Sequence, residues 1–500
     1  MGLLGVLIAA IIAGLSNRMP ALVIADLQGA QGFSSDDASW LTSAYAAGEL
    51  AAMPFAGWFA VTFSLRRFHL AMLGSSLVLA AIIPSIQSLE LMVALRVIHG
   101  LVSGAMIPLL MMAALRFLPL SIRLHGLALY ALTATFAPNV ALWFAAQCVD
   151  ALTDWRWVFW AMLPLGAVSM ALVAYGVPKS AANLSRMRGA DWMGMALGMP
   201  GLALLVIGID QGVRLDWLNS PIVSAALFAG ASLTALFLLS EWFHPQPFMQ
   251  LQLLGRRNLG LGFSVFFVLL MVMTTSVGFP ANALGQQHGF RLEQTASLGL
   301  VVALPQLVLG PLVALLLYQR WVDARYVFAT GLLVIALACW NASGFTSLWI
   351  VKEFLPTQSL FALGQPMAVV SLLFLATSVV KPPEGPSVSG LVNTLRALGS
   401  GCGAALIGEL LALRQRFHSD MLLDAAGSLQ PGTTSAMRPT ELAAIVAQQA
   451  GVLAAADVYR VFAVMALLLI PVVLRLNHIP APSAPHPDRP DPQPATSTLR

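Results

Sequence analysis

Five charged side chains lie inside otherwise apolar stretches of the sequence, and these residues are the first candidates for chemistry: Arg18, Glu49, Arg96, Arg396 and Glu409. A charge surrounded by hydrocarbon is costly, and such residues usually mark a pathway for ions or substrates. A carboxyl there is subject to two opposing effects, because burial favours its neutral form and a nearby guanidinium favours its charged form. A group balanced in this way takes up and releases a proton as its neighbours move.

Glu49 is the strongest candidate for such a proton carrier. At a helical rise of about 1.5 Å per residue it lies roughly 14 Å from the start of its helix near Trp40, and Arg18 and Arg96 lie roughly 8–10 Å below the same surface. The three side chains are therefore expected in one half of a helical bundle, with Arg18 or Arg96 as the partner that sets the proton affinity of Glu49. The alternative is a static pair of Glu49 with an arginine that holds two helices together.

Further side chains are candidates for the lining of a substrate cavity. Arg396 is expected to face the cavity, whereas Glu409 is expected near the outer membrane surface. Polar and aromatic residues complete the predicted lining, and helix packing is the alternative role for each of them: Asn139, Phe136, Trp143, Gln306 and Gln365.

The elements that position these residues follow from the composition. Of the 500 residues, 58% are hydrophobic and 10% are charged, against roughly 45–50% and about 25% in soluble domains. A soluble fold of this length has no interior large enough for that much apolar surface. The chain is therefore predicted to be an all-α polytopic membrane protein.

A spanning helix needs about 20 mostly apolar residues, and about fourteen stretches of the sequence meet that requirement. They are predicted over residues 3–24, 40–62, 70–86, 91–117, 127–149, 157–177, 192–209, 221–242, 259–284, 295–317, 326–343, 355–380, 388–413 and 458–476.

Basic residues indicate how these helices are oriented. In short loops, clusters of Lys and Arg mark the cytoplasmic side of the membrane. Pairs and triplets of basic residues fall in alternate loops, which predicts that both termini lie in the cytoplasm: Arg66/Arg67, Arg116/Arg123, Lys179/Arg186/Arg188, Arg256/Arg257 and Arg320/Arg325.

Two segments are predicted outside the membrane. The first is a long outer loop over 414–457, whose second half resembles an amphipathic helix opened by Thr440. The second is a cytoplasmic tail over 477–500, which is rich in proline from residue 480 onward and is expected to be disordered.

The sequence contains no pattern typical of an enzyme. Motifs for zinc hydrolysis, for a serine nucleophile and for a phosphate-binding loop do not occur. No metal site, no cofactor and no nucleic-acid partner is therefore predicted. Transport across the membrane would have to be driven by an ion gradient.

Three segments resemble a known family. Residues 39–45 (SWLTSAY) with 54–58 (PFAGW), residues 95–100 (LRVIHG), and residues 155–159 (WRWVF) with 163–166 (LPLG) are similar to motifs of the major facilitator superfamily. With fourteen helices, the chain resembles the drug:proton antiporters of the EmrB/QacA type. The resemblance implies a role in proton coupling for Arg96, and a gating loop that contains Arg66 and Arg67.

The sequence also departs from this family. The loop motif after the second helix lacks its usual aspartate, and the Gly-Pro and Gly-Gly pairs of the fifth-helix motif are replaced by Ala141-Leu142 and Ala145-Ala146. The acidic residue often found in the first helix is Ser16 here. Glu49 is therefore interpreted as a relocated acid.

The resemblance implies an organisation and a function. The expected parts are a six-helix bundle over 1–180, two linker helices over 181–257 and a second six-helix bundle over 258–476. The expected function is proton-coupled efflux of drugs or toxic amphipathic compounds across a bacterial inner membrane, with a periplasmic adaptor and an outer-membrane channel as partners. The alternative is a secondary transporter dedicated to one metabolite, siderophore or aromatic acid.

Overall fold

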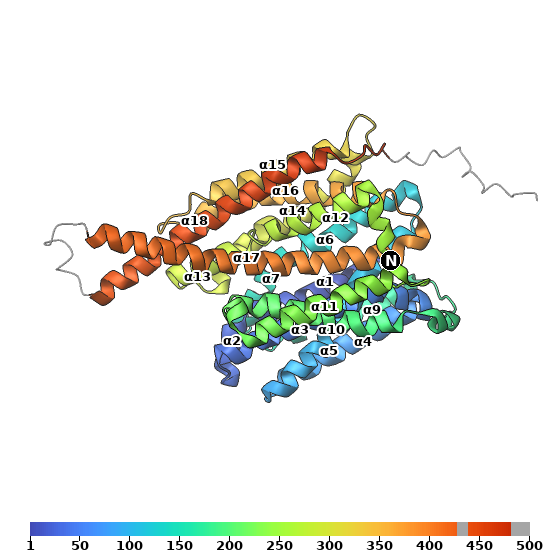
Figure 1. The fold of residues 1–500 in the computed structure, drawn as a ribbon, viewed down its shortest axis with the longest axis horizontal. Coiled ribbons are helices and arrows are strands. Elements are labelled where there is room, and N and C mark those ends of the chain that lie inside the picture. Colours follow the sequence, from blue (N-terminus) through green and yellow to red (C-terminus); the bar gives the residue numbers. More distant parts are fainter. Residues whose placement is uncertain (428–438, 482–500) are drawn as a thin grey trace, which may run out of the picture.

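The computed structural model describes residues 1–427 and 439–481, and within this part of the chain every regular element is a helix (Figure 1). Thirteen helices are long and apolar enough to cross a membrane, and the number becomes fourteen when one bent pair is counted as a single span. The predicted set of about fourteen spanning helices is confirmed.

The first bundle contains the helices that precede residue 177. Their bounds are α1 (Gly2–Leu22), α2 (Ile24–Gln31), α3 (Ser35–Phe63), α4 (Leu65–Ile82), α5 (Leu89–Phe117), α6 (Leu120–Thr135), α7 (Ala137–Ala146), α8 (Trp157–Trp160) and α9 (Met162–Gly176), with the short helices η1 (Ile83–Ser85) and η2 (Gln147–Ala151).

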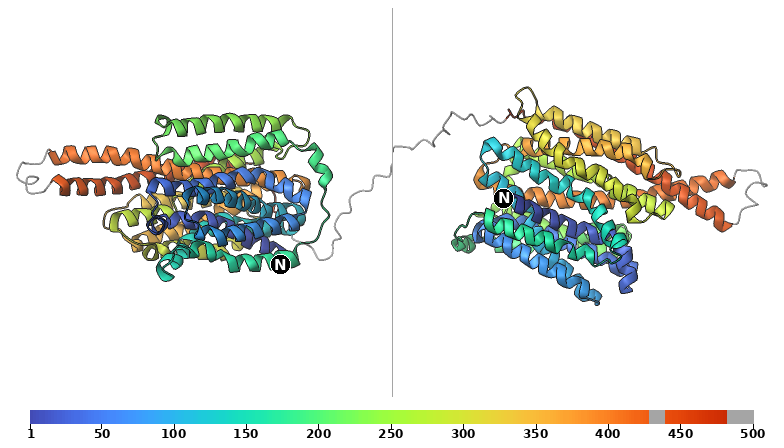
Figure 2. Two further views of the ribbon diagram at one scale, coloured as in Figure 1. Left: turned by 90° about the horizontal axis from the view of Figure 1, so that it is seen from below. Right: turned by 180° about the vertical axis from the view of Figure 1, so that it is seen from behind.

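Two additional helices, α10 (Trp192–Gly212) and α11 (Pro221–Phe243), follow the first bundle and pack against each other. They are drawn in green along one side of the molecule in Figure 2. Helix α10 contacts α3 of the first bundle and α17 of the second. Short helices flank the pair: η3 (Leu184–Gly189), η4 (Trp217–Asn219) and η5 (Leu251–Gly255).

The second bundle contains the remaining helices. They are α12 (Arg257–Met273), α13 (Gly278–His288), α14 (Leu292–Leu317), α15 (Ala324–Ala342), α16 (Val351–Thr377), α17 (Gly385–Gly427) and α18 (Pro439–Leu474), with η6 (Pro382–Glu384) before α17. Two six-helix bundles with two extra helices are the predicted architecture, which the structure confirms.

The fifth span is bent rather than straight. Helices α6 and α7 meet at Phe136 and differ in direction by 44°. Pro138 lies in the first turn of α7, where its missing N–H removes a hydrogen bond from the continuous helix and interrupts it. The bend directs the following residue, Asn139, toward the second bundle, where it bonds Gln365.

Residues 414–427 of the predicted outer loop are helical, which was not expected, whereas a helix is present from Pro439 onward, in the half of the segment where one was expected. Helix α17 continues through Arg414 to Gly427 and is 43 residues long, and α18 begins at Pro439. At about 1.5 Å per residue α17 measures roughly 64 Å, twice the apolar thickness of a bilayer. The two helices therefore extend beyond the body as a hairpin, on the left of Figure 1.

Two other expectations concern the same end of the chain. Thr440 is the second residue of α18 and not the cap of a separate helix. Of the predicted tail over 477–500, residues 482–500 lie outside the described residues.

Candidate translocation cavity

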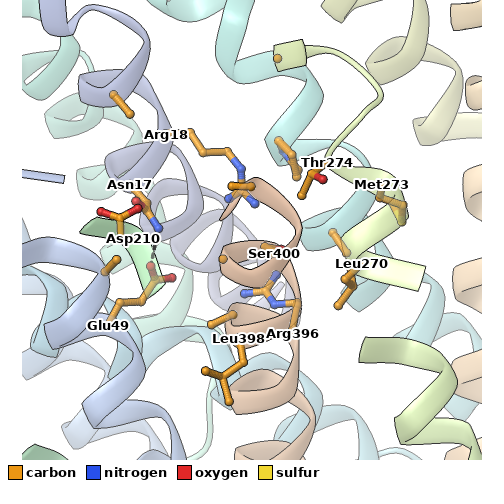
Figure 3. A pocket seen from close by; sticks show the side chains of 18 of the residues that line it. Asn17, Arg18, Glu49, Asp210, Leu270, Met273, Thr274, Arg396, Leu398 and Ser400 are labelled. Atoms are coloured by element: carbon orange, nitrogen blue, oxygen red, sulfur yellow. Dashed lines mark hydrogen bonds between the residues drawn. The ribbon is translucent and has the colours of Figure 1, made fainter. Parts of the chain in front are cut away.

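A cavity of about 470 Å³ lies between the two bundles, lined by residues of α1, α3, α6, α7, α10, α12, α13, α16 and α17 and of the turn between α12 and α13. Four of its lining residues are charged, namely Arg18, Glu49, Asp210 and Arg396. Leu270, Met273 and Leu398 form an apolar part of the wall (Figure 3). The cavity thus combines ionic groups with apolar surface, which suits an amphipathic solute.

Glu49 is buried, with 6% of its surface exposed. Its carboxylate accepts a hydrogen bond from the Asn17 side-chain amide, drawn as a dashed line in Figure 3. The backbone at Glu49 is held by Gly104 of α5, where any Cβ would collide with the Glu49 carbonyl oxygen. Close packing of α3 on α5 therefore fixes where the carboxyl sits.

The two cavity arginines are held by backbone oxygens rather than by carboxylates. Arg18 donates to the Gly14 carbonyl at 3.5 Å, and Arg396 donates to the carbonyl and hydroxyl oxygens of Thr133 at 3.2 Å. Nε of Arg396 is buried without a hydrogen-bond partner. Within the described part of the chain neither guanidinium forms an ion pair, so both retain hydrogen-bonding capacity toward a solute.

Arg96 occupies a different place from the one expected. It is 1% exposed, donates to the carbonyl oxygens of Leu41 at 3.3 Å and Ser16 at 3.2 Å, and lies over the Tyr45 ring at 4.3 Å. It does not line the cavity. The structure therefore brings Arg18 and Glu49 to one cavity and sets Arg96 behind α3, where it braces the first bundle.

Asn139 and Gln365 line the cavity together and join the two bundles. The Asn139 amide donates to the Gln365 side-chain oxygen at 2.9 Å, and the Ser276 hydroxyl donates to Asn139 at 2.9 Å. This polar cluster links α7 of the first bundle to α16 and to the turn after α12. A motion that separates the bundles has to break or exchange these bonds.

Three residues from the predicted lining lie outside the cavity. Phe136 and Trp143 pack against a buried apolar cluster that includes Ala303 of the second bundle. Gln306 donates to the carbonyl oxygens of Val302 at 3.1 Å and Ala362 at 3.0 Å. Arg66 and Arg67 lie in the first turn of α4, which follows α3 after the single residue Ser64.

Asp210 is a cavity residue that the sequence did not indicate. The predicted helix ended at Ile209, directly before Asp210, whereas α10 continues to Gly212. The carboxyl accepts a hydrogen bond from the Ser43 hydroxyl of α3. An acidic residue in the last turn of an apolar helix was the available signal.

The bundles touch at both ends of the cavity. Toward the end at which α1 begins, α3 and α17 are in backbone contact, and a Cβ on Gly57 would lie 2.5 Å from the Pro386 carbonyl oxygen. At the opposite end, Arg291 of the second bundle bonds Asp150 of the first at 2.6 Å and lies 3.6 Å from Asp26. The two bundles are thus in contact on either side of the cavity.

This chain is similar in sequence to several known proteins. It is 24% identical over 453 residues to the multidrug export protein EmrB of Haemophilus influenzae, which covers 87% of this chain and 86% of the relative. It is 22% identical over 473 residues to the fatty acid resistance protein FarB of Neisseria gonorrhoeae, with 89% and 90% covered. It is 23% identical over 437 residues to the probable multidrug resistance protein EmrY of Escherichia coli, with 83% and 81% covered.

Solved structures support the fold. The human organic anion transporter MFSD10 matches with a TM-score of 0.57 at 14% identity, over 94% of this chain and 98% of the other. The proton:xylose symporter XylE matches with a TM-score of 0.56 at 12% identity, over 95% of each chain. The family model for the Major Facilitator Superfamily matches residues 6–404. The resemblance to EmrB-type exporters is thus confirmed, and the chain is a multi-pass membrane protein that belongs to the Major Facilitator Superfamily.

Proposed function

We propose that the protein exports amphipathic organic compounds in exchange for protons, and that Glu49 carries the proton. The observation that carries this proposal is a buried carboxyl in the wall of a cavity that also contains two unpaired guanidiniums. The similarity to multidrug exporters supports the same cargo class.

The charge arrangement gives a physical reason for coupling. Arg18 and Arg396 both line the cavity with Glu49, and a cation near a carboxyl favours its ionised form while burial favours its neutral form. Arg18 belongs to the first bundle and Arg396 to the second, so a rocking motion changes the distance from Arg396 to Glu49 more than that from Arg18. Glu49 then binds a proton in one state and releases it in the other.

The test is transport by reconstituted full-length protein in liposomes with an imposed pH gradient. Glu49→Gln should reduce gradient-driven transport at least tenfold and leave exchange of labelled for unlabelled substrate intact, because exchange needs no net proton movement. Glu90→Gln, an exposed acid at the start of α5, is the matched control. Gradient-driven transport by Glu49→Gln at the wild-type rate contradicts the assignment.

We also place both termini in the cytoplasm of a bacterial cell and the α17–α18 hairpin in the periplasm. The basic loops support this orientation. A fluorescent protein that matures only in the cytoplasm, fused to the C-terminus, should fluoresce. A dark but stably expressed fusion contradicts the orientation.

The hairpin is the proposed contact for a periplasmic adaptor that leads to an outer-membrane channel. Leu413, Phe417 and Met421 are spaced four residues apart on α17 and are 51%, 47% and 56% exposed. They form an apolar stripe beyond the roughly 20 residues that cross the bilayer. Exposed apolar surface of this kind typically marks a protein contact.

Crosslinking to a co-expressed adaptor tests this contact. Replacing the three stripe residues together with Ala should abolish the crosslink without loss of expression. Alanines at Leu333 and Leu337, which are exposed on α15 within its span, provide the control. An unchanged crosslink contradicts the placement.

A further inference from the structure

Asp210 brings an acidic group of the additional helices into the cavity. It lies in the last turn of α10 and lines the cavity, and it is exposed whereas Glu49 is buried. Figure 3 shows Asp210 on the same side of the cavity as Asn17 and Glu49, with Arg18 and Arg396 beside them. The helix pair that distinguishes this chain from a twelve-helix arrangement thus contributes directly to the lining.

A chain of hydrogen-bond donors fixes the Asp210 carboxyl. Arg214 donates to the Gln211 side-chain oxygen at 2.8 Å, Gln211 donates to the Ser43 hydroxyl at 2.6 Å, and Ser43 donates to Asp210. Asp36 anchors Arg214 at 2.6 Å. Because arginine stays protonated, this chain does not conduct protons, and it serves to orient the carboxyl as an acceptor.

Asp210 has no cationic partner of its own. The described residues provide no ion pair to it, since its neighbour in the chain of donors is a neutral hydroxyl. A carboxylate that is oriented, accessible from a cavity and not neutralised is a group that binds a cation.

The charge of the cavity depends on Asp210. Arg18 and Arg396 contribute two positive charges, and Glu49 offsets one of them only while it is ionised. Without Asp210 the cavity would be positive in either protonation state of Glu49 and would repel organic cations. With an ionised Asp210 the cavity is neutral when Glu49 is ionised, and its acidic side attracts a cationic group.

We propose that Asp210 sets the charge selectivity of the cavity, admitting lipophilic organic cations that the two arginines would otherwise exclude. This inference rests on the proposed function in taking the cavity to be the place where cargo binds. The oriented carboxylate supplies the ionic contact, and Leu270, Met273 and Leu398 supply the apolar surface for the body of the cation.

Tetraphenylphosphonium and tetraphenylborate test this proposal, because they have nearly the same size and shape and opposite charges. Equilibrium binding of each ion is measured on the full-length protein in lipid nanodiscs at neutral pH, without a gradient. Asp210→Asn should weaken binding of the cation by about tenfold or more and strengthen binding of the anion, as expected for removal of one charge within several ångströms. Asp210→Glu, which keeps the charge, should keep the wild-type ratio.

Asp216→Asn is the matched control, since Asp216 is an exposed acid just beyond α10. An unchanged ratio of the two affinities in Asp210→Asn overturns the inference, as does an equal change in Asp216→Asn or an absence of saturable binding of either ion to the wild type. A shifted ratio in a protein that transports nothing under a proton gradient would instead refute the proposed function and leave the role of Asp210 standing.

Discussion

The contact between Arg291 and Asp150 should control how closely the two bundles approach at the end opposite the start of α1. Arg291 Nε bonds Asp150 at 2.6 Å, and the same carboxylate accepts the backbone N–H of Glu293 at 2.9 Å. Asp150 belongs to η2 of the first bundle and Arg291 precedes α14 of the second. Replacing Asp150 with Asn removes the charge on one side of this contact.

The free energy lost in Asp150→Asn depends on how far solvent reaches the two charged side chains. Two unit charges 4 Å apart interact by about 4 kcal/mol at an effective dielectric constant of 20. The Asp150 side chain is only 7% exposed, but that of Arg291 is 64% exposed. Solvent and ions screen such a pair, and measured exposed pairs contribute about 0.2–1 kcal/mol. Taking about 1 kcal/mol, the ratio of closed to open populations should fall about fivefold.

Distances between spin labels measure this ratio. One label is placed at Gly29 of α2, where added atoms meet no neighbour, and the other at the exposed Gln286 of α13, after the native cysteines are replaced. Asp150→Asn should enlarge the longer-distance population, and high salt should produce part of that change in the wild type. Asp154→Asn serves as the control. Identical distance distributions for wild type and Asp150→Asn would refute the reasoning.

Two further predictions concern stability in detergent. Gly104→Ala should lower the thermal unfolding temperature and disable transport, because the added Cβ meets the Glu49 backbone and overpacking costs about 1–3 kcal/mol. Gly451 has open space around it, so the control variant Gly451→Ala should change neither the unfolding temperature nor transport. Asp323→Ala should cost about 0.5–2 kcal/mol, because Asp323 caps α15. Burial raises the pKa of Asp323, but bonds from Arg325 outweigh this effect and hold the pKa below its ordinary value. The wild type should therefore lose stability as pH falls below about 3.9, and Asp323→Asn should lose less over the same range.

The spanning helices were predictable because hydropathy and length alone decide them. The prediction failed where another effect set the boundary. The apolar stretch ends near Leu413, because charged residues such as Arg414 and Arg416 follow it. Helix α17 nevertheless continues, because a helix that leaves the membrane still forms its own backbone hydrogen bonds.

The candidate site was predictable only in part. Charges within apolar stretches identified Arg18, Glu49 and Arg396, all of which line the cavity. The direction in which each side chain points is not contained in that signal, so Phe136 and Trp143 were assigned to the lining although they pack against a buried apolar cluster instead. The bend at Phe136 rotates the following turns and no hydropathy pattern records it.

Helix α17 connects the cavity wall to the end of the hairpin without interruption. The helix carries Arg396 in the cavity wall and reaches Gly427 at the hairpin, a separation of roughly 45 Å at 1.5 Å per residue. By this geometry, a tilt of about 5° around the cavity displaces the far end by roughly 4 Å. By this geometry, a small tilt of α17 around a bound solute moves the end of the hairpin by a larger distance. A fluorophore attached to the hairpin would therefore report the binding of a solute from outside the bilayer.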